Sequence, residues 1–276
     1  MFEIFFTHSF LFMALLAGIA ASFTSGIIGS YVVTKRIVFI SGSISHSVLG
    51  GMGLFLWLKR TYNLTFLSPM QGALLAALAS AFLLGWTHLK YKEREDSIIA
   101  ALWATGMSIG VIFITFTPGY NVELMNFLFG NILWVTRSDL ITLLALNAIV
   151  IACTLFFYRK FQAICFDEEQ ALLQGIAVQP LYILLLCLVA TSVVVLIQIV
   201  GAVLVISMLT MPAAIAASIT QKLSSMMKIA ILAGIIFTCL GIYASYQLNW
   251  PPGATITLIA ASAYVLVLCK SKVKSR

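Results

Sequence analysis

The sequence predicts an all-α polytopic membrane protein: eight to nine transmembrane helices, a short outer interfacial helix and a short cytoplasmic helix. Two observations predict this class. Hydrophobic residues make up 62% of the 276 residues and charged residues only 9%, whereas about a quarter of the residues in soluble domains are charged. Apolar runs of roughly 20 residues, long enough to cross a bilayer, fill almost the whole chain. We therefore expect a single transmembrane domain over residues 1–276, with no room for a soluble catalytic domain.

Nine apolar runs lie between charged or Pro/Gly-rich breaks. They cover residues 9–34, 43–58, 69–89, 97–117, 138–158, 179–198, 200–219, 226–246 and 251–269. The division near Gly201 is open, because the run 181–219 is nearly unbroken and permits another arrangement. The first run follows only Met1-Phe2-Glu3, without a basic leader, so we interpret it as a retained span.

Basic residues predict the orientation. If the C-terminus is cytoplasmic, nine crossings place the N-terminus outside. Only Lys59, Arg60 and Arg137 of the 16 lysines and arginines then lie on the outer side, a strong positive-inside bias. Basic inner loops also account for the net charge of +7 without a nucleic-acid partner.

Two connections are expected to carry structure of their own. Residues 118–138 are too apolar for a free loop and too polar for a span, which predicts a short helix lying at, or re-entering, the outer interface. On the inner side, residues 159–179 hold three of the nine acidic residues. A docking segment for a cytoplasmic partner is one interpretation of this inner connection, and a solvated loop is the other.

The stretch 166–175 within the inner connection has the pattern of a short helix. Asp167, Glu168 and Glu169 fall in its first turn, where they favour the helix dipole. Ala171, Leu172 and Leu173 form an apolar patch, and Gly175 is placed to end the helix. This pattern favours a docking helix over a solvated loop.

His46 is the candidate for a transport path. It lies inside a membrane-length apolar run, where an ionisable ring is costly unless it faces protein or a water-filled passage. Ser43, Ser45 and Ser47, with nearby glycines, make this helix small and polar, which is typical of close packing or of a passage lining. The alternative is a structural histidine bonded to a backbone carbonyl of a neighbouring helix.

Three other residues within spans have open interpretations. Asn147 and Gln198 either line a path or form hydrogen bonds between helices, and the second interpretation is the more common one. Pro212 is expected to kink or end a helix, which would suit a gate.

The motifs that are missing narrow the mechanism. The sequence has no G-x-x-x-x-G-K-[ST] loop, so it does not bind and hydrolyse ATP by that route. It has no HExxH or Gly-x-Ser-x-Gly motif. Every acidic residue falls in or beside a predicted connection, so no mid-membrane carboxylate is available to carry a proton. These features disfavour a proton-driven carrier and an intramembrane hydrolase, and they leave passive flow or a motor on another chain.

Four stretches in order along the chain carry a family resemblance. They are residues 29–36 (GSYVVTKR), 39–53 (FISGSISHSVLGGMG), 166–175 (FDEEQALLQG) and 200–214 (VGAVLVISMLTMPAA). Together they resemble the membrane permease subunit of ATP-driven metal-ion importers, the zinc/manganese/iron permease family of ABC transporters.

The resemblance implies a homodimer in the bacterial cytoplasmic (inner) membrane, one permease domain per chain. It implies a cytoplasmic ABC ATPase subunit docked on a coupling helix at residues 166–175, and an extracytoplasmic metal-binding protein. ATP hydrolysis would then occur on the partner, so this chain would not itself be an enzyme. No permanently bound cofactor is implied, only a transported divalent metal ion, zinc or manganese. The importing direction rests on the resemblance alone.

One position departs from the family pattern. Many members have an aspartate four residues before the histidine, and this chain has Gly42 there. His46 would then rely on Ser43, Ser45, Ser47, a water or the second copy of His46. Neutral ligands favour zinc over manganese. The alternative function is a self-sufficient secondary carrier or exporter of small organic molecules, which leaves the patterned acidic segment unexplained.

Overall fold

The computed structural model describes residues 9–90, 95–118, 127, 130 and 132–274. Within these residues, nine helices are long and apolar enough to cross a membrane, which confirms the predicted fold class. An apolar chain in lipid forms such helices because each satisfies its own backbone hydrogen bonds. The nine are α2 (Ser9–Thr34), α3 (Val38–Thr61), α4 (Pro69–Lys90), α5 (Glu95–Phe116), α7 (Arg137–Phe166), α9 (Val178–Val200), α10 (Ala202–Ile219), α11 (Leu223–Leu248) and α12 (Pro252–Lys274).

The division of the longest apolar run falls at Gly201. This residue has φ +85°, a backbone conformation that glycine adopts without steric cost, and it separates α9 from α10. The prediction of a break near Gly201 is therefore confirmed. Pro212 lies inside α10, which continues to Ile219, so this proline does not end the helix.

Helix α7 is longer than expected. The sequence predicted a span over 138–158, but α7 continues to Phe166 and contains 30 residues. Its length is about 45 Å, more than the roughly 30 Å of a hydrocarbon core. The extension has no glycine or proline. Phe161 and Ile164 within it are fully buried, so the helix continues to pack beyond the charged residues after position 158, which had suggested its end.

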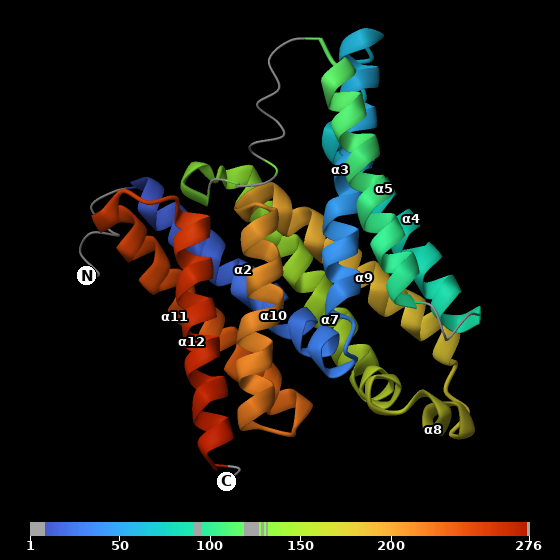
Figure 1. The fold of residues 1–276 in the computed structure, drawn as a ribbon, viewed down its shortest axis with the longest axis vertical. Coiled ribbons are helices and arrows are strands. Elements are labelled where there is room, and N and C mark those ends of the chain that lie inside the picture. The colour runs from blue at the N-terminus through green and yellow to red at the C-terminus, as the bar shows by residue number, and fades with distance from the viewer. Residues whose placement is uncertain (1–8, 91–94, 119–126, 128–129, 131, 275–276) are drawn as a thin grey trace. The chain divides into compact units, whose positions relative to one another are not determined.

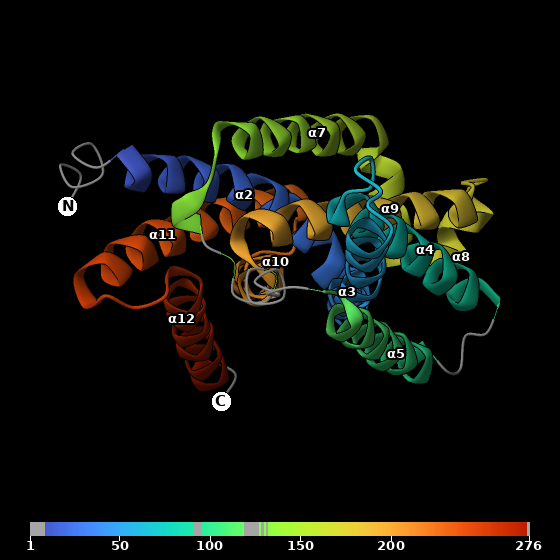
Figure 2. The same ribbon diagram turned by 90° about the horizontal axis from the view of Figure 1, so that it is seen from above.

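The described chain forms two compact units. The first comprises residues 1–36, 128–158 and 195–276, and the second comprises residues 37–127 and 159–194. In the first unit, α2 packs on α10 and α11, and α12 packs on the same two helices. In the second unit, α3 packs against both α4 and α5, and both views show these three helices alongside one another (Figures 1 and 2). A single domain over the whole chain stays a prediction.

The expected outer interfacial helix of residues 118–138 falls mainly outside the described residues. Of this stretch, Ile132–Trp134 forms one turn of 3-10 helix, η1. Residues 137 and 138 already belong to α7.

A polar bridge joins two helices of the first unit. The Asn147 side chain on α7 donates from Nδ2 to the Ala20 carbonyl on α2, at 2.9 Å. The Thr24 hydroxyl on α2 donates to Asn147 Oδ1. Asn147 therefore forms the interhelical hydrogen bond that was one of its two interpretations. Gln198 near the end of α9 is exposed.

Glycines bring α3 and α5 into backbone contact. A Cβ on Gly50 of α3 would lie 2.9 Å from the Gly106 carbonyl oxygen, and one on Gly53 would lie 2.7 Å from the Gly110 carbonyl oxygen. A Cβ on Gly106 would overlap the backbone of Ser47. The two helices are therefore as close as their backbones allow, and this fixes which α5 side chains face His46.

Replacing Gly106 with alanine is expected to destabilise the second unit. The added methyl group would meet backbone rather than a flexible side chain, and such overpacking costs about 1–3 kcal/mol. Gly42→Ala is the matched control in the same interface, because its Cβ would lie 3.4 Å from the nearest Trp103 ring atom, an ordinary contact. Thermal unfolding of both variants in detergent checks the prediction, and equal unfolding temperatures would contradict it.

Candidate functional site

His46 lies in the third turn of α3 and is half-buried among buried neighbours. Its ring stacks on the indole of Trp103 from α5, with ring centroids 4.4 Å apart and planes inclined by 15°. One face of the imidazole is therefore covered by an aromatic ring. The ring nitrogens, whose metal-binding lone pair lies in the ring plane, are not used by this stack.

The three serines beside His46 form hydrogen bonds within the second unit. Ser43 Oγ donates to the Ile99 carbonyl of α5 at 3.0 Å, and Ser45 Oγ donates to the Ser41 carbonyl of its own helix at 2.8 Å. Ser47 Oγ lies 2.9 Å from Ser80 Oγ of α4. All three serines are buried. A hydroxyl that donates its hydrogen retains acceptor lone pairs, so their contribution to a path stays a prediction.

A single imidazole suits an ion in transit. Stably held structural zinc has four protein ligands, whereas His46 contributes one nitrogen. Within the part of the chain that the structure describes, no three His, Cys, Asp or Glu side chains gather in the manner of a metal cluster. What the arrangement shows chemically is a nitrogen donor whose ring is stacked on an indole, while the three hydroxyls bond to Ile99, Ser41 and Ser80.

The short inner helix is α8 (Glu168–Leu173), and both of its ends are capped. Asp167 is its N-cap, with Oδ1 accepting from the Gln170 N–H at 3.0 Å. At the other end, Gly175 has φ +75°, and the Ile176 N–H donates to the Ala171 carbonyl at 3.1 Å, a Schellman closure. The predicted short helix is therefore confirmed, and its cytoplasmic location stays a prediction. It is shorter than 166–175, because Phe166 is the last residue of α7.

The apolar residues of α8 divide between two faces. Ala171 is 1% exposed and packs inward, whereas Leu172 is 64% exposed and Leu173 is 88% exposed. Solvated leucines on a short helix offer an apolar contact to a partner. The sequence grouped the three residues as one patch, but only the two leucines are available on the surface.

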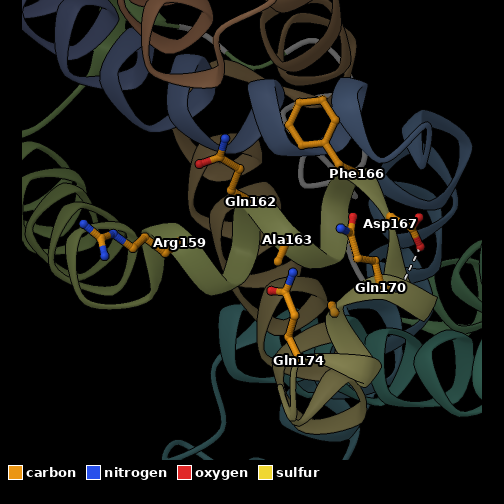
Figure 3. A pocket seen from close by; sticks show the side chains of 8 residues that line it. Arg159, Gln162, Ala163, Phe166, Asp167, Gln170 and Gln174 are labelled. Carbon is orange, nitrogen blue, oxygen red and sulfur yellow. Dashed lines mark hydrogen bonds between the residues drawn. The ribbon is translucent and has the colours of Figure 1, made fainter.

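A polar cavity of about 340 Å³ lies between the last turns of α7 and α8 (Figure 3). Figure 3 shows the side chain of Arg159 directed away from α8. Asp167 lines the cavity at the end opposite Arg159, and its carboxylate caps α8. The lining residues are Arg159, Gln162, Ala163, Phe166, Asp167, Gln170, Ala171 and Gln174. The surface around α8 therefore offers amide groups next to the exposed leucines.

An interaction that the sequence did not predict ties α8 to α4. His88 Nε2 near the end of α4 lies 3.2 Å from Glu168 Oε1 and 3.4 Å from Oε2. The His88 ring also packs on Tyr182 of α9, with centroids 4.4 Å apart. Two turns earlier on α4, Ser80 contacts Ser47 of α3. Helix α4 thus connects α8 with the helix that carries His46.

Removing the His88–Glu168 interaction is expected to loosen α8. His88→Ala and Glu168→Ala each remove the contact between these two side chains, which are only 16% and 21% exposed, a loss of about 1 kcal/mol. Amide hydrogen exchange over residues 168–173 should then accelerate about fivefold. Glu169→Ala, an exposed neighbour in the same turn, is the matched control. Exchange in His88→Ala equal to that of the unmodified chain would contradict this role.

In the part of the chain that the structure describes, nine apolar helices and the short capped helix α8 are typical of a membrane-spanning permease. The chain belongs to the ABC 3 transport family (ABC-3), whose model matches residues 7–271. This membership confirms the class of transporter that the sequence motifs resembled and argues against a self-sufficient carrier.

Named relatives cover most of the chain. It is 46% identical over 257 residues to a probable metal transport system membrane protein of Chlamydia pneumoniae, covering 93% of this chain and 87% of the relative. It is 32% identical over 260 residues to the manganese transport system membrane protein MntC of Halalkalibacterium halodurans, covering 94% and 87%. Among solved structures, PsaBC from Streptococcus pneumoniae in complex with Fab matches with a TM-score of 0.83 and 26% identity, covering 97% of this chain and 95% of that chain.

Proposed function

We propose that this chain is the permease subunit of an ATP-driven importer of a divalent transition-metal ion, and that a separate cytoplasmic subunit hydrolyses the ATP. The observation that carries the proposal is the 46% identity to a probable metal transport system membrane protein along 93% of this chain. The family match over residues 7–271 supports the transporter class.

The working assembly contains two copies of the chain, a pair of ATPase subunits and an extracytoplasmic metal-binding protein. It lies in the bacterial inner membrane, with the N-terminus outside and the C-terminus in the cytoplasm, as the distribution of basic residues indicates. The ATPase docks on α8, where Leu172 and Leu173 are exposed. Glu169 and Asp167 add negative charge to the same segment, and Gly175 closes it. The chain itself is a transport protein rather than an enzyme.

Movement of α8 reaches the transport path through α4. Closure of the ATPases displaces α8, and its Glu168 pulls on His88 of α4. The contact between Ser80 and Ser47 then passes the displacement to α3 beside His46. Rigid helices joined by specific contacts are the kind of element through which such coupling travels.

The ion passes His46, and zinc is the favoured cargo. The imidazole nitrogen is a neutral donor, the lone pairs that remain on the hydroxyls of Ser43, Ser45 and Ser47 would supply neutral oxygens, and the position one turn earlier is Gly42 rather than a carboxylate. Nitrogen donors suit zinc, whereas carboxylate oxygens suit manganese. No cofactor is held permanently; the metal ion is the substrate.

Manganese is the second candidate cargo. One observation favours it specifically: a relative 32% identical over 260 residues is named as a manganese transport system membrane protein. The two cargoes differ in the ligands they prefer, so a direct comparison of the ions discriminates between them.

The proposal is tested by co-expressing this chain with its candidate ATPase and extracytoplasmic protein. The ATPase activity of the purified complex is then measured with that protein free of metal, loaded with zinc, or loaded with manganese. We expect a stable complex whose activity rises severalfold with the zinc-loaded protein. Stimulation by the manganese-loaded protein alone would establish the second candidate. If no complex forms and this chain alone moves organic solutes in vesicles, the proposed function is wrong.

A further inference from the structure

We propose that Trp103 is a further residue of the transport site, which holds the His46 ring in place and favours zinc over manganese. The inference rests on the proposed function, because it concerns the ion that passes His46. Nothing in the sequence pattern singled out Trp103, which lies in an apolar run of α5 between Leu102 and Ala104.

The first support is the geometry of the two rings. Their centroids are 4.4 Å apart and their planes are nearly parallel, at 15°. In this arrangement the indole covers a face of the imidazole and restricts rotation of the ring. The nitrogen lone pair, which lies in the ring plane, keeps a fixed direction. A ligand atom held in one direction binds an ion with less loss of conformational freedom.

The second support is the fit between Trp103 and Gly42, one turn before His46. A Cβ on Gly42 would lie 3.4 Å from Cζ3 and 3.8 Å from Cη2 of the indole. A methyl group there makes ordinary contact, but a longer side chain directed the same way would collide with the ring. The indole therefore occupies the space beside His46 from which a side chain at position 42 would approach the ion.

The third support is that α5 is fixed on both sides of Trp103. One turn earlier, the Ile99 carbonyl accepts a hydrogen bond from Ser43. One turn later, Gly106 lies against the backbone of Ser47. These two contacts hold α5 against α3 on either side of Trp103. The position of the indole over His46 therefore follows from the packing of the two helices.

The physical consequence concerns which ion is preferred. A metal-bound imidazole carries positive charge, and the negative face of an indole stabilises such a charge. The indole supplies no oxygen ligand and leaves little room for a carboxylate. Such a site selects between ions by their affinity for a nitrogen ligand, which is much higher for zinc than for manganese. Removing the indole should admit water beside His46 and reduce that preference.

The test uses the complete complex reconstituted in vesicles, with initial rates of zinc and manganese uptake measured separately. Trp103→Ala is expected to lower the zinc-to-manganese rate ratio about fivefold or more, equivalent to about 1 kcal/mol of selectivity. Trp103→Phe, which keeps an aromatic face, should retain the ratio within about twofold. Trp57→Ala is the matched control, since Trp57 lies in the same helix pair and contacts Phe113 of α5. It should change both rates alike and leave the ratio unchanged.

A second measurement does not depend on transport. Zinc ions are added to the purified permease in detergent, and tryptophan emission is recorded for the unmodified chain and for Trp103→Phe, Trp57→Phe and His46→Gln. We expect a zinc-dependent change that persists in Trp57→Phe and is lost in the other two variants.

The outcomes separate the two proposals. An unchanged uptake ratio in Trp103→Ala, or an unchanged zinc response in Trp103→Phe, would overturn the role of Trp103. If the zinc response behaves as expected but the unmodified complex moves neither ion, the role of Trp103 beside His46 is supported and the proposed importer is wrong.

Discussion

Replacing His46 with alanine is expected to reduce ATP-dependent zinc uptake by the reconstituted complex at least about tenfold. The imidazole is the nitrogen donor of the proposed path, and loss of even the groups that only support a metal ligand costs 10–100-fold. Assembly with the ATPase should be retained, because His46 lies within α3 and α8 is a separate element. Initial uptake rates over a range of limiting zinc concentrations measure the effect.

A variant of the same helix provides the control for His46. Ser41 is buried, and its hydroxyl donates to the Val38 carbonyl within α3. Ser41→Ala should leave zinc uptake within about twofold, because a single hydrogen bond of this kind contributes only about 1 kcal/mol to stability. If His46→Ala transports zinc as fast as Ser41→Ala at every limiting concentration, His46 has no role in the path.

Replacing both Leu172 and Leu173 with aspartate should detach the ATPase subunit. These side chains are 64% and 88% exposed in the free chain, so the change costs the fold itself little. Burial of a leucine contributes about 1.5–3 kcal/mol. Loss of two such contacts weakens binding by at least about 100-fold, and the added charges oppose an apolar contact further. Binding of the purified ATPase to the permease, measured by titration, reports the loss.

Methionine at the same two positions is the conservative control for the docking prediction. Its size and polarity are close to those of leucine, so the double methionine variant should keep the affinity within about threefold. The thermal unfolding of all three permeases should coincide. An aspartate variant that unfolds normally and still binds the ATPase with full affinity would place the docking site elsewhere.

The spans and the inner helix could be predicted because their signals are local. Twenty consecutive apolar residues identify a span wherever it packs. The two ends of α8 are likewise marked by single residues. Asp167 has a side chain suited to an N-cap, and Gly175 readily adopts the positive φ that ends a helix. The break at Gly201 was harder to predict, because only the backbone conformation of one glycine interrupts an otherwise continuous run.

The contacts that build the site could not be predicted, because they join residues far apart in the chain. His46 and Trp103 meet only because glycines let α3 and α5 pack backbone to backbone, and hydropathy does not encode that register. His88 and Glu168 are 80 positions apart. The extension of α7 to Phe166 was missed for a related reason, since buried packing of Phe161 outweighs the charges that suggested an end.

The most direct test of the central claim is metal accumulation by the full complex in sealed vesicles, with and without ATP. Vesicles containing this chain and the ATPase are supplied with the metal-binding protein, and internal zinc and manganese are measured over time. The proposed function predicts zinc accumulation that requires ATP and stops when the ATPase is inactivated. Accumulation of neither ion, in a complex that still hydrolyses ATP, would contradict the claim that this permease imports a divalent metal.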